Sequence, residues 1–224
     1  MSVLSVRDLE VTYKTQAGPI PAVRGVSLDI DPGEVLGLAG ESGCGKSTVV
    51  NAILRLLPAG TTVSGEVLLN GEDVLTMKPG RLRAVRWTGA SVVFQGAMHA
   101  MNPVQRIGDQ LAEAIVLHGQ AGEKEALVRV GDLLEQVGMP PRRLRDYPHE
   151  LSGGQKQRVM IAMALACSPS LVIADEPTTA LDVMVQAQVL SLLNKLQREL
   201  GLAMLFITHD LSVLVEICDR LAIM

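Results

Sequence analysis

The sequence predicts an α/β fold in which a parallel sheet with crossover helices is joined to an antiparallel sheet and to a helical segment. Three observations predict it: alternating apolar residues in the first third, helical spacing in the middle third, and alternating strand and helix patterns in the last third. The chain has 224 residues, of which 48% are hydrophobic and 20% charged. It is therefore globular and long enough for one large domain or two small ones.

The first third predicts an antiparallel sheet. Apolar and polar residues alternate there in three runs, at 4–6, 9–13 and 26–30. Asn70-Gly71 is a hairpin signal. The run 35–39 is instead continuously apolar, as expected for a strand covered on both faces, and a helix is predicted over 47–57.

The middle third predicts a mainly helical insert. Its apolar residues keep helical spacing, with charged residues between them, at Leu127, Val130, Leu134 and Val137. The stretch 159–166 is nearly all apolar, which predicts a helix buried on all sides that Pro169 ends.

The last third predicts a parallel sheet. Two apolar strands, at 171–174 and 202–208, are separated by a helix whose apolar residues lie on one face. Asp182 can cap that helix. A strand followed by a crossover helix and another strand is the usual unit of a parallel sheet.

Composition excludes several classes of protein. The net charge is −4, and the aromatic residues are only two Phe, two Tyr and one Trp, so a nucleic-acid partner is not expected. Three scattered cysteines suit a reducing compartment. Neither a secretory signal nor a membrane span is predicted, so we expect a cytoplasmic protein. A mean hydropathy of +0.29 indicates either a large core or apolar surface kept for a partner.

A phosphate-binding loop follows the predicted buried strand. Residues 40–47 satisfy G-x-x-x-x-G-K-[ST] between a strand and a helix, which is the context that the motif requires. Its glycines let successive N–H groups converge on a phosphate at a helix N-terminus. Lys46 supplies charge for the outer phosphates, Ser47 can ligate Mg²⁺, and Thr48 can donate to an inner phosphate. The predicted nucleotide-binding residues here are Gly40, Glu41, Ser42, Gly43, Cys44, Gly45, Lys46, Ser47 and Thr48.

Two acids complete the predicted chemistry of this loop. Asp175 ends the apolar strand and is the natural partner of Mg²⁺, directly or through water. Glu176 is the next residue, where a carboxylate can polarise a water for attack on the γ-phosphate. ATP and Mg²⁺ are therefore the expected ligands, although an isolated Asp-Glu pair could also be a solvated strand end.

A second anion site is predicted at Leu151-Ser152-Gly153-Gly154-Gln155. Ser152 is placed to cap the following helix, and the two glycines expose its first N–H groups. One triphosphate can hardly be wrapped by this segment and by the phosphate loop of the same chain. We therefore expect a head-to-tail dimer with ATP between one chain's phosphate loop and the other chain's Ser152 loop. A common glycine-bearing loop before a helix is the alternative.

The order of these motifs resembles that of the ATP-binding cassette (ABC) ATPases over essentially the whole chain. The LSGGQ segment ahead of an Asp-Glu strand end is the most specific part of the resemblance. The resemblance implies a P-loop NTPase with a RecA-like parallel-sheet core, an N-terminal antiparallel β subdomain and a helical signature subdomain. We expect one domain over 1–224, with the β subdomain and core at 1–95 and 166–224 and the helical subdomain at 96–165.

The resemblance also implies roles for other residues. Tyr13 would stack on adenine, Gln95 would contact magnesium or the attacking water, and His209 would contact the γ-phosphate. LSGGQ would bind the γ-phosphate in trans, and residues 179–182 match a D-loop that crosses the dimer interface. Packing is the alternative role for Tyr13, and loop or structural positions are the alternatives for Gln95 and His209. The implied catalytic residues are Glu176, His209, Gln95 and Lys46, the metal ligands are Ser47, Gln95 and Asp175, and Ser152, Gly153, Gly154, Gln155 and Asp182 join the nucleotide-binding residues.

Segments 94–104 and 147–155 resemble the ATPases of bacterial oligopeptide, dipeptide and nickel importers. The resemblance implies an ATP-hydrolysing importer subunit, peripheral at the cytoplasmic face of the inner membrane. Its implied partners are an identical or sister ATPase subunit, transmembrane permease subunits and, indirectly, a solute-binding protein. Such relatives continue past a strand like 220–224, some into a cysteine-bearing extension for an iron–sulfur cluster, so this sequence is expected to be a fragment without that extension.

Two other functions remain as alternatives. A soluble ABC ATPase acting on DNA or ribosomes would carry a long coiled coil, two cassettes or basic linkers, whereas this chain has one acidic cassette without sustained heptads. A nucleotide-binding regulatory module without turnover is disfavoured by the presence of Glu176, Gln95 and His209 together.

Overall fold

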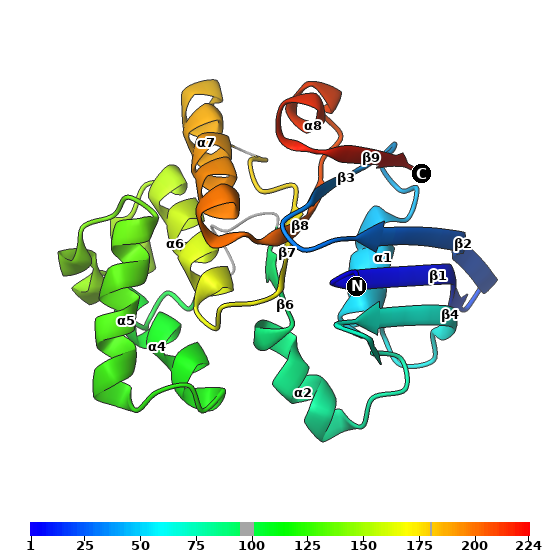
Figure 1. The fold of residues 1–224 in the computed structure, drawn as a ribbon, viewed down its shortest axis with the longest axis horizontal. Helices are drawn as coiled ribbons and strands as arrows, with labels where there is room; N and C mark the ends of the chain where they lie inside the picture. The colour runs from blue at the N-terminus through cyan, green and yellow to red at the C-terminus, as the bar shows by residue number, and fades with distance from the viewer. Residues whose placement is uncertain (95–100, 180) are drawn as a thin grey trace.

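The computed structural model of the chain describes residues 1–94, 101–179 and 181–224. These residues form an antiparallel sheet, a parallel sheet and a group of helices (Figure 1). The antiparallel sheet has the order β2-β1-β4-β5. Its strands are β1 (Leu4–Thr15), β2 (Gly18–Ile30), β4 (Thr62–Leu69) and β5 (Glu72–Asp73).

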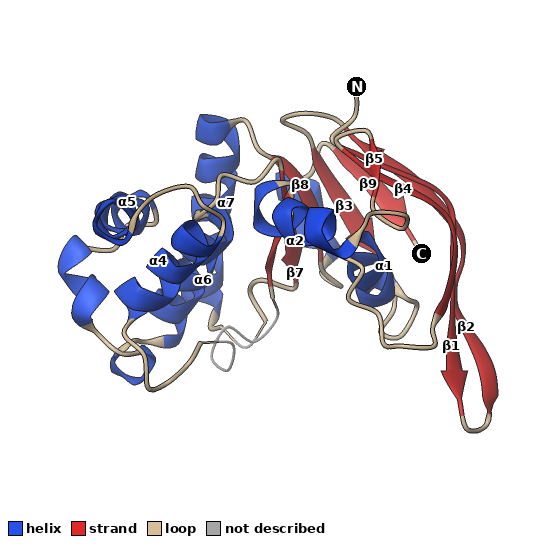
Figure 2. Cartoon of the chain, turned by 90° about the horizontal axis from the view of Figure 1, so that it is seen from below, coloured by secondary structure: helices blue, strands red, loops and turns tan. Residues whose placement is uncertain are grey.

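The alternation predicted for the first third is confirmed in β1. Its inward residues Leu4, Val6, Leu9 and Val11 are fully buried, and a register shift after Val6 keeps Leu9 and Val11 on the inner face. The predicted Asn70-Gly71 turn joins β4 to the short β5. Beyond the sheet, β1 and β2 continue as a two-stranded ribbon (Figure 2).

The parallel sheet has the order β6-β7-β8-β3-β9. All five residues of β3 are buried, as its apolar run predicts. Because β3 lies beside β8, and β8 beside β7, the carboxyl ends of these three strands meet at one edge, where such sheets bind ligands. The strands are β3 (Val35–Ala39), β6 (Ala90–Val93), β7 (Leu171–Asp175), β8 (Ala203–Ile207) and β9 (Arg220–Ile223).

The helices lie on both faces of the parallel sheet and in a separate lobe. In Figure 1, α4, α5 and α6 form that lobe, and Figure 2 shows α1 between β3 of the parallel sheet and the antiparallel sheet. The helices are α1 (Lys46–Ile53), α2 (Pro79–Thr88), α4 (Ile107–Leu117), α5 (Glu123–Gln136), α6 (Gly153–Leu165), α7 (Val183–Leu200) and α8 (Leu211–Ile217), with 3₁₀ turns η1 (Pro141–Arg145) and η2 (Pro148–Glu150).

Two hydrophobic cores meet at the parallel sheet. Val172 and Ala174 of β7 belong to the core shared with the helical lobe, whereas Leu171 and Ile173 belong to the core shared with α1 and the antiparallel sheet. Successive side chains of a strand point to opposite faces, so one strand serves both cores. The parallel sheet therefore supports the helical lobe on one face, and α1 with the antiparallel sheet on the other.

Both helix caps predicted from sequence are confirmed, but one helix is shorter than predicted. The Ser152 hydroxyl accepts from the Gln155 N–H at the start of α6, and the Asp182 carboxylate accepts from the Val185 N–H at the start of α7. The helix predicted over 47–57 ends at Ile53, because Arg55 takes a left-handed conformation with φ 52°.

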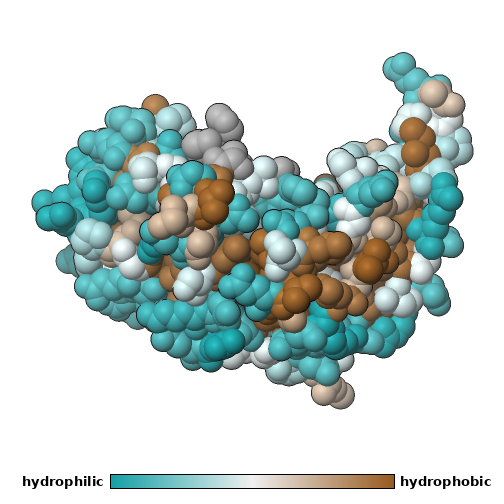
Figure 3. Space-filling model, turned by 90° about the horizontal axis from the view of Figure 1, so that it is seen from above, coloured by the Kyte–Doolittle hydropathy of each residue, from teal (hydrophilic) through white to brown (hydrophobic). Residues whose placement is uncertain are grey.

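The surface carries apolar side chains as well. On the face seen in Figure 3 they gather in a band across the middle, between more polar ends. The exposed apolar residues of α8 and β9 are Leu211, Val215, Leu221 and Ile223. The high mean hydropathy thus reflects exposed apolar surface in addition to the two cores. Among the helices that the structure describes, none combines the length and apolar character needed to span a bilayer.

Candidate nucleotide-binding site

A cavity of about 620 Å³ lies at the carboxyl ends of the central parallel strands. It brings together four segments that are far apart in the sequence, namely β1–β2, the phosphate loop with the start of α1, the end of β7 and the loop after β8. Every residue that lines it except Ala22 is a site residue predicted from sequence. The lining consists of Tyr13, Ala22, Ser42, Gly43, Gly45, Lys46, Ser47, Thr48, Asp175, Glu176 and His209.

The phosphate loop curls around the Lys46 ammonium. Lys46 is buried, and its Nζ donates to the carbonyl oxygens of Gly40 (2.7 Å) and Glu41 (2.9 Å). Gly45 has φ +112°, and a Cβ there would lie 2.5 Å from the Ala22 carbonyl oxygen, so only glycine fits. Gly40, Glu41 and Cys44 belong to the loop without lining the cavity. A positive charge and a helix N-terminus therefore face the same space, which suits a phosphate.

Tyr13 approaches the loop from the antiparallel sheet. It lies in β1, and its hydroxyl donates to Thr48 Oγ1 in the first turn of α1 (3.2 Å). The contact fixes the phenol ring beside the cavity rather than inside the sheet core. Tyr13 therefore lines the cavity, as its predicted role in binding adenine requires.

Ser47 and Asp175 form an oxygen-rich corner of the cavity. A hydrogen bond from Ser47 and the charge of Lys46 lower the pKa of Asp175, but burial and the neighbouring Glu176 outweigh them and raise it above its usual value. A cation would offset both of these penalties, so the pair fits Mg²⁺, which prefers oxygen ligands. Within the described residues, no group of three or more His, Cys, Asp or Glu side chains is arranged to hold a metal ion, so phosphate oxygens and water would supply the other ligands.

Glu176 is held between two neighbours. Its Oε1 lies 3.2 Å from His209 Nδ1, and its Oε2 accepts from the Thr179 hydroxyl at 2.9 Å. The Glu176 side chain is 19% exposed, against 68% for His209. Its backbone has φ 46°, a conformation that costs free energy for a non-glycine residue and is enriched at functional sites. The carboxylate is thus fixed at the mouth of the cavity.

The remaining predicted site residues lie outside this cavity. Ser152, Gly153, Gly154 and Gln155 form the first turn of α6, and Asp182 caps α7. A Cβ on Gly154 would lie 2.5 Å from Val185 Cγ1, so glycine lets α6 approach α7. Gln95 lies outside the described residues. The signature segment therefore does not contribute to the cavity of its own chain.

Sequence reasoning missed two residues of this site. Ala22 lines the cavity only because the register of β2 brings it to Gly45, and no sequence pattern reports that contact. Thr179 was assigned only to the D-loop, but its hydroxyl also holds Glu176. A threonine three residues after an acid at a strand end is the signal that could have found it.

The three thiols are expected to differ in reactivity. Burial and the neighbouring Asp219 raise the pKa of Cys218 to about 12, and burial raises the pKa of Cys167. At pH 8 a thiol of pKa about 12 is ionised in about one molecule in ten thousand, and the thiolate is the nucleophile. Mass spectrometry after brief iodoacetamide treatment should find the label on the partly exposed Cys44 first. Equally fast labelling of Cys218 would contradict this assignment.

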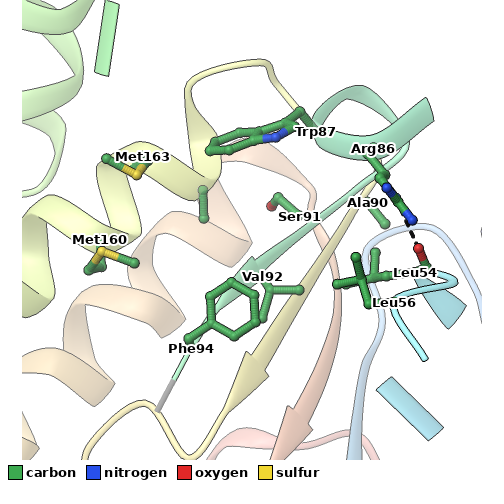
Figure 4. Close-up of a pocket in the computed structure, with 11 residues that line it drawn as sticks. Leu54, Leu56, Arg86, Trp87, Ala90, Ser91, Val92, Phe94, Met160 and Met163 are labelled. Carbon is green, nitrogen blue, oxygen red and sulfur yellow. Dashed lines mark hydrogen bonds between the residues drawn. The ribbon is translucent and has the colours of Figure 1, made fainter. Parts of the chain in front are cut away.

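A second cavity, of about 440 Å³, lies between α6, β6 and the segment that directly follows α1 (Figure 4). Its walls are mostly apolar, and Ser91 Oγ has no hydrogen-bond partner among the described residues although Ser91 is only 5% exposed. The residues that line it are Leu54, Leu56, Arg86, Trp87, Ala90, Ser91, Val92, Phe94, Met160, Met163 and Ala164. The helices α1 and α6 begin at the two predicted anion-binding segments. Their C-terminal ends thus lie at the same cavity.

Comparison with known proteins gives matches over nearly the whole chain. The sequence profile described as "ABC transporter" matches residues 23–179. The probable peptide ABC transporter ATP-binding protein y4tR of Sinorhizobium fredii is 48% identical, with 99% of this chain and 68% of that protein covered. The peptidoglycan transport ATP-binding protein YejF of Agrobacterium fabrum is 51% identical, but the chain spans only 41% of its length.

A solved structure confirms the predicted fold class. The dimeric post-hydrolysis state of the ATP-binding cassette MJ0796, bound to ADP and Pi, superposes with a TM-score of 0.85 at 30% identity. The match covers 99% of this chain and 94% of that one.

Proposed function

The chain belongs to the ABC transporter family, and from this premise we propose that it binds and hydrolyses ATP as the energy-supplying subunit of a peptide importer. The observation that carries the proposal is the 620 Å³ cavity, in which Lys46, Asp175 and Glu176 face one space. A phosphate loop, an oxygen pair suited to Mg²⁺ and a fixed carboxylate are the parts that ATP hydrolysis needs.

In this proposal each side chain has a separate task. The Lys46 ammonium and the N–H groups that open α1 bind the β- and γ-phosphates of ATP. Ser47 and Asp175 hold Mg²⁺, which when bound neutralises charge on the phosphate oxygens. A Glu176 carboxylate oxygen accepts the proton of the attacking water. The Thr179 hydroxyl, which donates to Glu176, orients this carboxylate. His209, beside the same carboxylate, contacts the γ-phosphate, and the Tyr13 ring lies against the adenine.

We further propose that two copies, or this chain and a sister subunit, bind ATP head to tail. The position of the α6 N-terminus outside the cavity of its own chain supports this arrangement. In a dimer, Ser152, Gly153 and Gly154 of one chain face the γ-phosphate held by the other. The MJ0796 cassette, which is 30% identical, is a dimer with ADP and Pi bound, and this supports the arrangement as well.

The second cavity is our candidate surface for a membrane permease. Its apolar walls and the unpartnered Ser91 hydroxyl suit the end of a partner helix that offers one polar group. A permease bound there would hold the chain at the cytoplasmic face of the membrane. Peptides are the proposed solute class because the relatives are named for transport of peptides and of peptidoglycan, which carries peptide chains.

Phosphate release by the purified chain tests the ATPase proposal. We expect hydrolysis that depends on both ATP and Mg²⁺ and rises more than linearly with protein concentration, because two chains build each site. EDTA should abolish it, and Ca²⁺ addition should not fully restore it. Hydrolysis strictly proportional to protein concentration, by a chain that remains monomeric, would contradict the shared site.

A further inference from the structure

Arg86 joins the second cavity to the helix that carries the phosphate loop. Its Nε donates to the carbonyl oxygen of Leu54 (3.0 Å) and its Nη2 to that of Arg55 (2.8 Å), and Figure 4 shows the first of these bonds. Both acceptors lie directly after α1, whose first residues are Lys46 and Ser47. One guanidinium therefore holds the far end of the helix whose near end binds phosphate.

The backbone at Arg86 and Trp87 departs from helical geometry where Arg86 contacts the end of α1. Arg86 has φ −61° and ψ 135°, and Trp87 has φ 78° and ψ −44°, so the chain leaves helical geometry within α2. A positive φ at tryptophan costs free energy and persists only where the surroundings fix it. The two non-helical residues send their side chains to different parts of the fold, Arg86 to α1 and Trp87 towards the helical lobe (Figure 4).

Trp87, the next residue, contacts the helical lobe. Its ring lies 6.2 Å from the ring of His118 at the end of α4, and it packs against the core of the helical lobe. Leu82 and Val85, on the same helix, belong to the other core. The Arg86-Trp87 pair thus spans the boundary between the two cores and lines the 440 Å³ cavity.

Partial burial and the nearby Arg55 cation lower the pKa of Arg86, so the hydrogen bonds to the end of α1 hold its guanidinium against both effects. The carbonyl end of a helix carries partial negative charge, which a cation stabilises. Arg55 lies close enough to Arg86 to repel it, but the Arg55 guanidinium is itself tied to the Met77 carbonyl oxygen at 2.6 Å. Two arginines therefore fix the segment after α1 from two directions.

Building on the proposed ATPase function, we propose that Arg86 is a positioning residue for hydrolysis. It fixes α1 from the cavity side, and so transmits the state of the cavity and of the helical lobe to Lys46 and Ser47. Arg86 does not touch the nucleotide. Small displacements of a positioned group lower the rate of a reaction strongly while they weaken binding less, so the effect should fall on kcat.

The single tryptophan gives a direct readout, because Trp87 is the only one in the sequence. Fluorescence excited selectively at tryptophan therefore reports only on the surroundings of Trp87, next to Arg86. We expect saturating Mg-ATP to change the Trp87 emission of the unsubstituted chain. We expect Arg86→Met to lose at least half of that change and to lower kcat about fivefold, with a Kd for Mg-ATP within about threefold of the original. Arg86→Lys, which keeps the charge but only one directed bond, should lie between.

Arg83→Met is the matched control, because Arg83 is exposed on the same helix. It should leave the emission change, kcat and Kd as they are. The inference is overturned if the unsubstituted chain binds Mg-ATP without any emission change, or if Arg86→Met keeps both the full change and a kcat within about twofold of Arg83→Met. Should Arg86→Met fail to fold, Arg86→Gln, too short to reach both carbonyls, decides by the same criteria.

A fourth measurement separates this inference from the proposed function. Without nucleotide, the amides of 46–53 should exchange hydrogen faster in Arg86→Met than in Arg83→Met, because the end of α1 is released. Equal exchange rates overturn the Arg86 contact by themselves. Absence of Mg-ATP binding by the unsubstituted chain would instead overturn the proposed function.

Discussion

Glu176→Gln is expected to leave Mg-ATP binding nearly unchanged and to lower the rate of hydrolysis about 10²–10⁴-fold, the range typical of a lost general base. Glutamine keeps the size of the side chain and an oxygen that the Thr179 hydroxyl can still donate to. It cannot accept the proton of the attacking water. Equilibrium binding of ATP and single-turnover phosphate release measure the two effects separately.

Glu216→Gln is the control for this substitution, because Glu216 is exposed on α8 and does not line the cavity. It should hydrolyse ATP at the original rate. If Glu176→Gln retained a rate within a few-fold of that control, Glu176 would not be the base. A loss of binding equal to the loss of rate would instead give Glu176 a role in holding the nucleotide.

Mixing two inactive variants is expected to restore hydrolysis. Lys46→Met removes the cation of the phosphate loop, and Gly153→Asp places a carboxylate at the helix N-terminus that should receive the γ-phosphate. Each variant alone should lose about 10²-fold or more. In an equal mixture that exchanges freely, half of the dimers are mixed and each has one intact site, so about a quarter of the original activity should return.

The control mixture combines Lys46→Met with Glu176→Gln. Both changes lie in the same cavity of their own chain, so every site in a mixed dimer carries one of them and no activity should return. Recovery in this control, or none in the first mixture although mixed dimers form, would contradict a site built from both chains. If the working dimer contains a sister subunit, the same experiment is done with one substitution in this chain and the other at the matching position of the sister subunit.

Much of the fold followed from local sequence signals. The buried strand β3 followed from the apolar run 35–39, and both helix caps followed from Ser152 and Asp182 standing before a helical pattern. The phosphate loop and the two acids could be assigned because their motifs follow strands directly. The grouping of Tyr13 and His209 with them needed a family resemblance as well, because β1 and β8 are distant in sequence.

The rest depends on tertiary contacts that no local pattern reports. The end of α1 at Ile53, four residues earlier than predicted, is set by the left-handed Arg55 and by Arg86, which comes from another helix. The kink at Trp87 likewise has no glycine or proline to announce it. The second cavity forms where the segment after α1, β6 and α6 come together, and among the described residues that line it only Phe94 belongs to the importer-like segments 94–104 and 147–155.

The place of β3 in the sheet has a consequence for how the protein is made. Both neighbours of β3, which are β8 and β9, are synthesised long after it, and the Val35 N–H donates to the Asp219 carboxylate 184 positions later in the chain. At ordinary ribosomal speed the nascent polypeptide needs roughly 10 to 40 s to supply them. For that time five apolar residues, next to the future phosphate loop, have no strand to pair with. The growing chain therefore exposes an unpaired apolar segment during this time, and exposed segments of this kind favour aggregation.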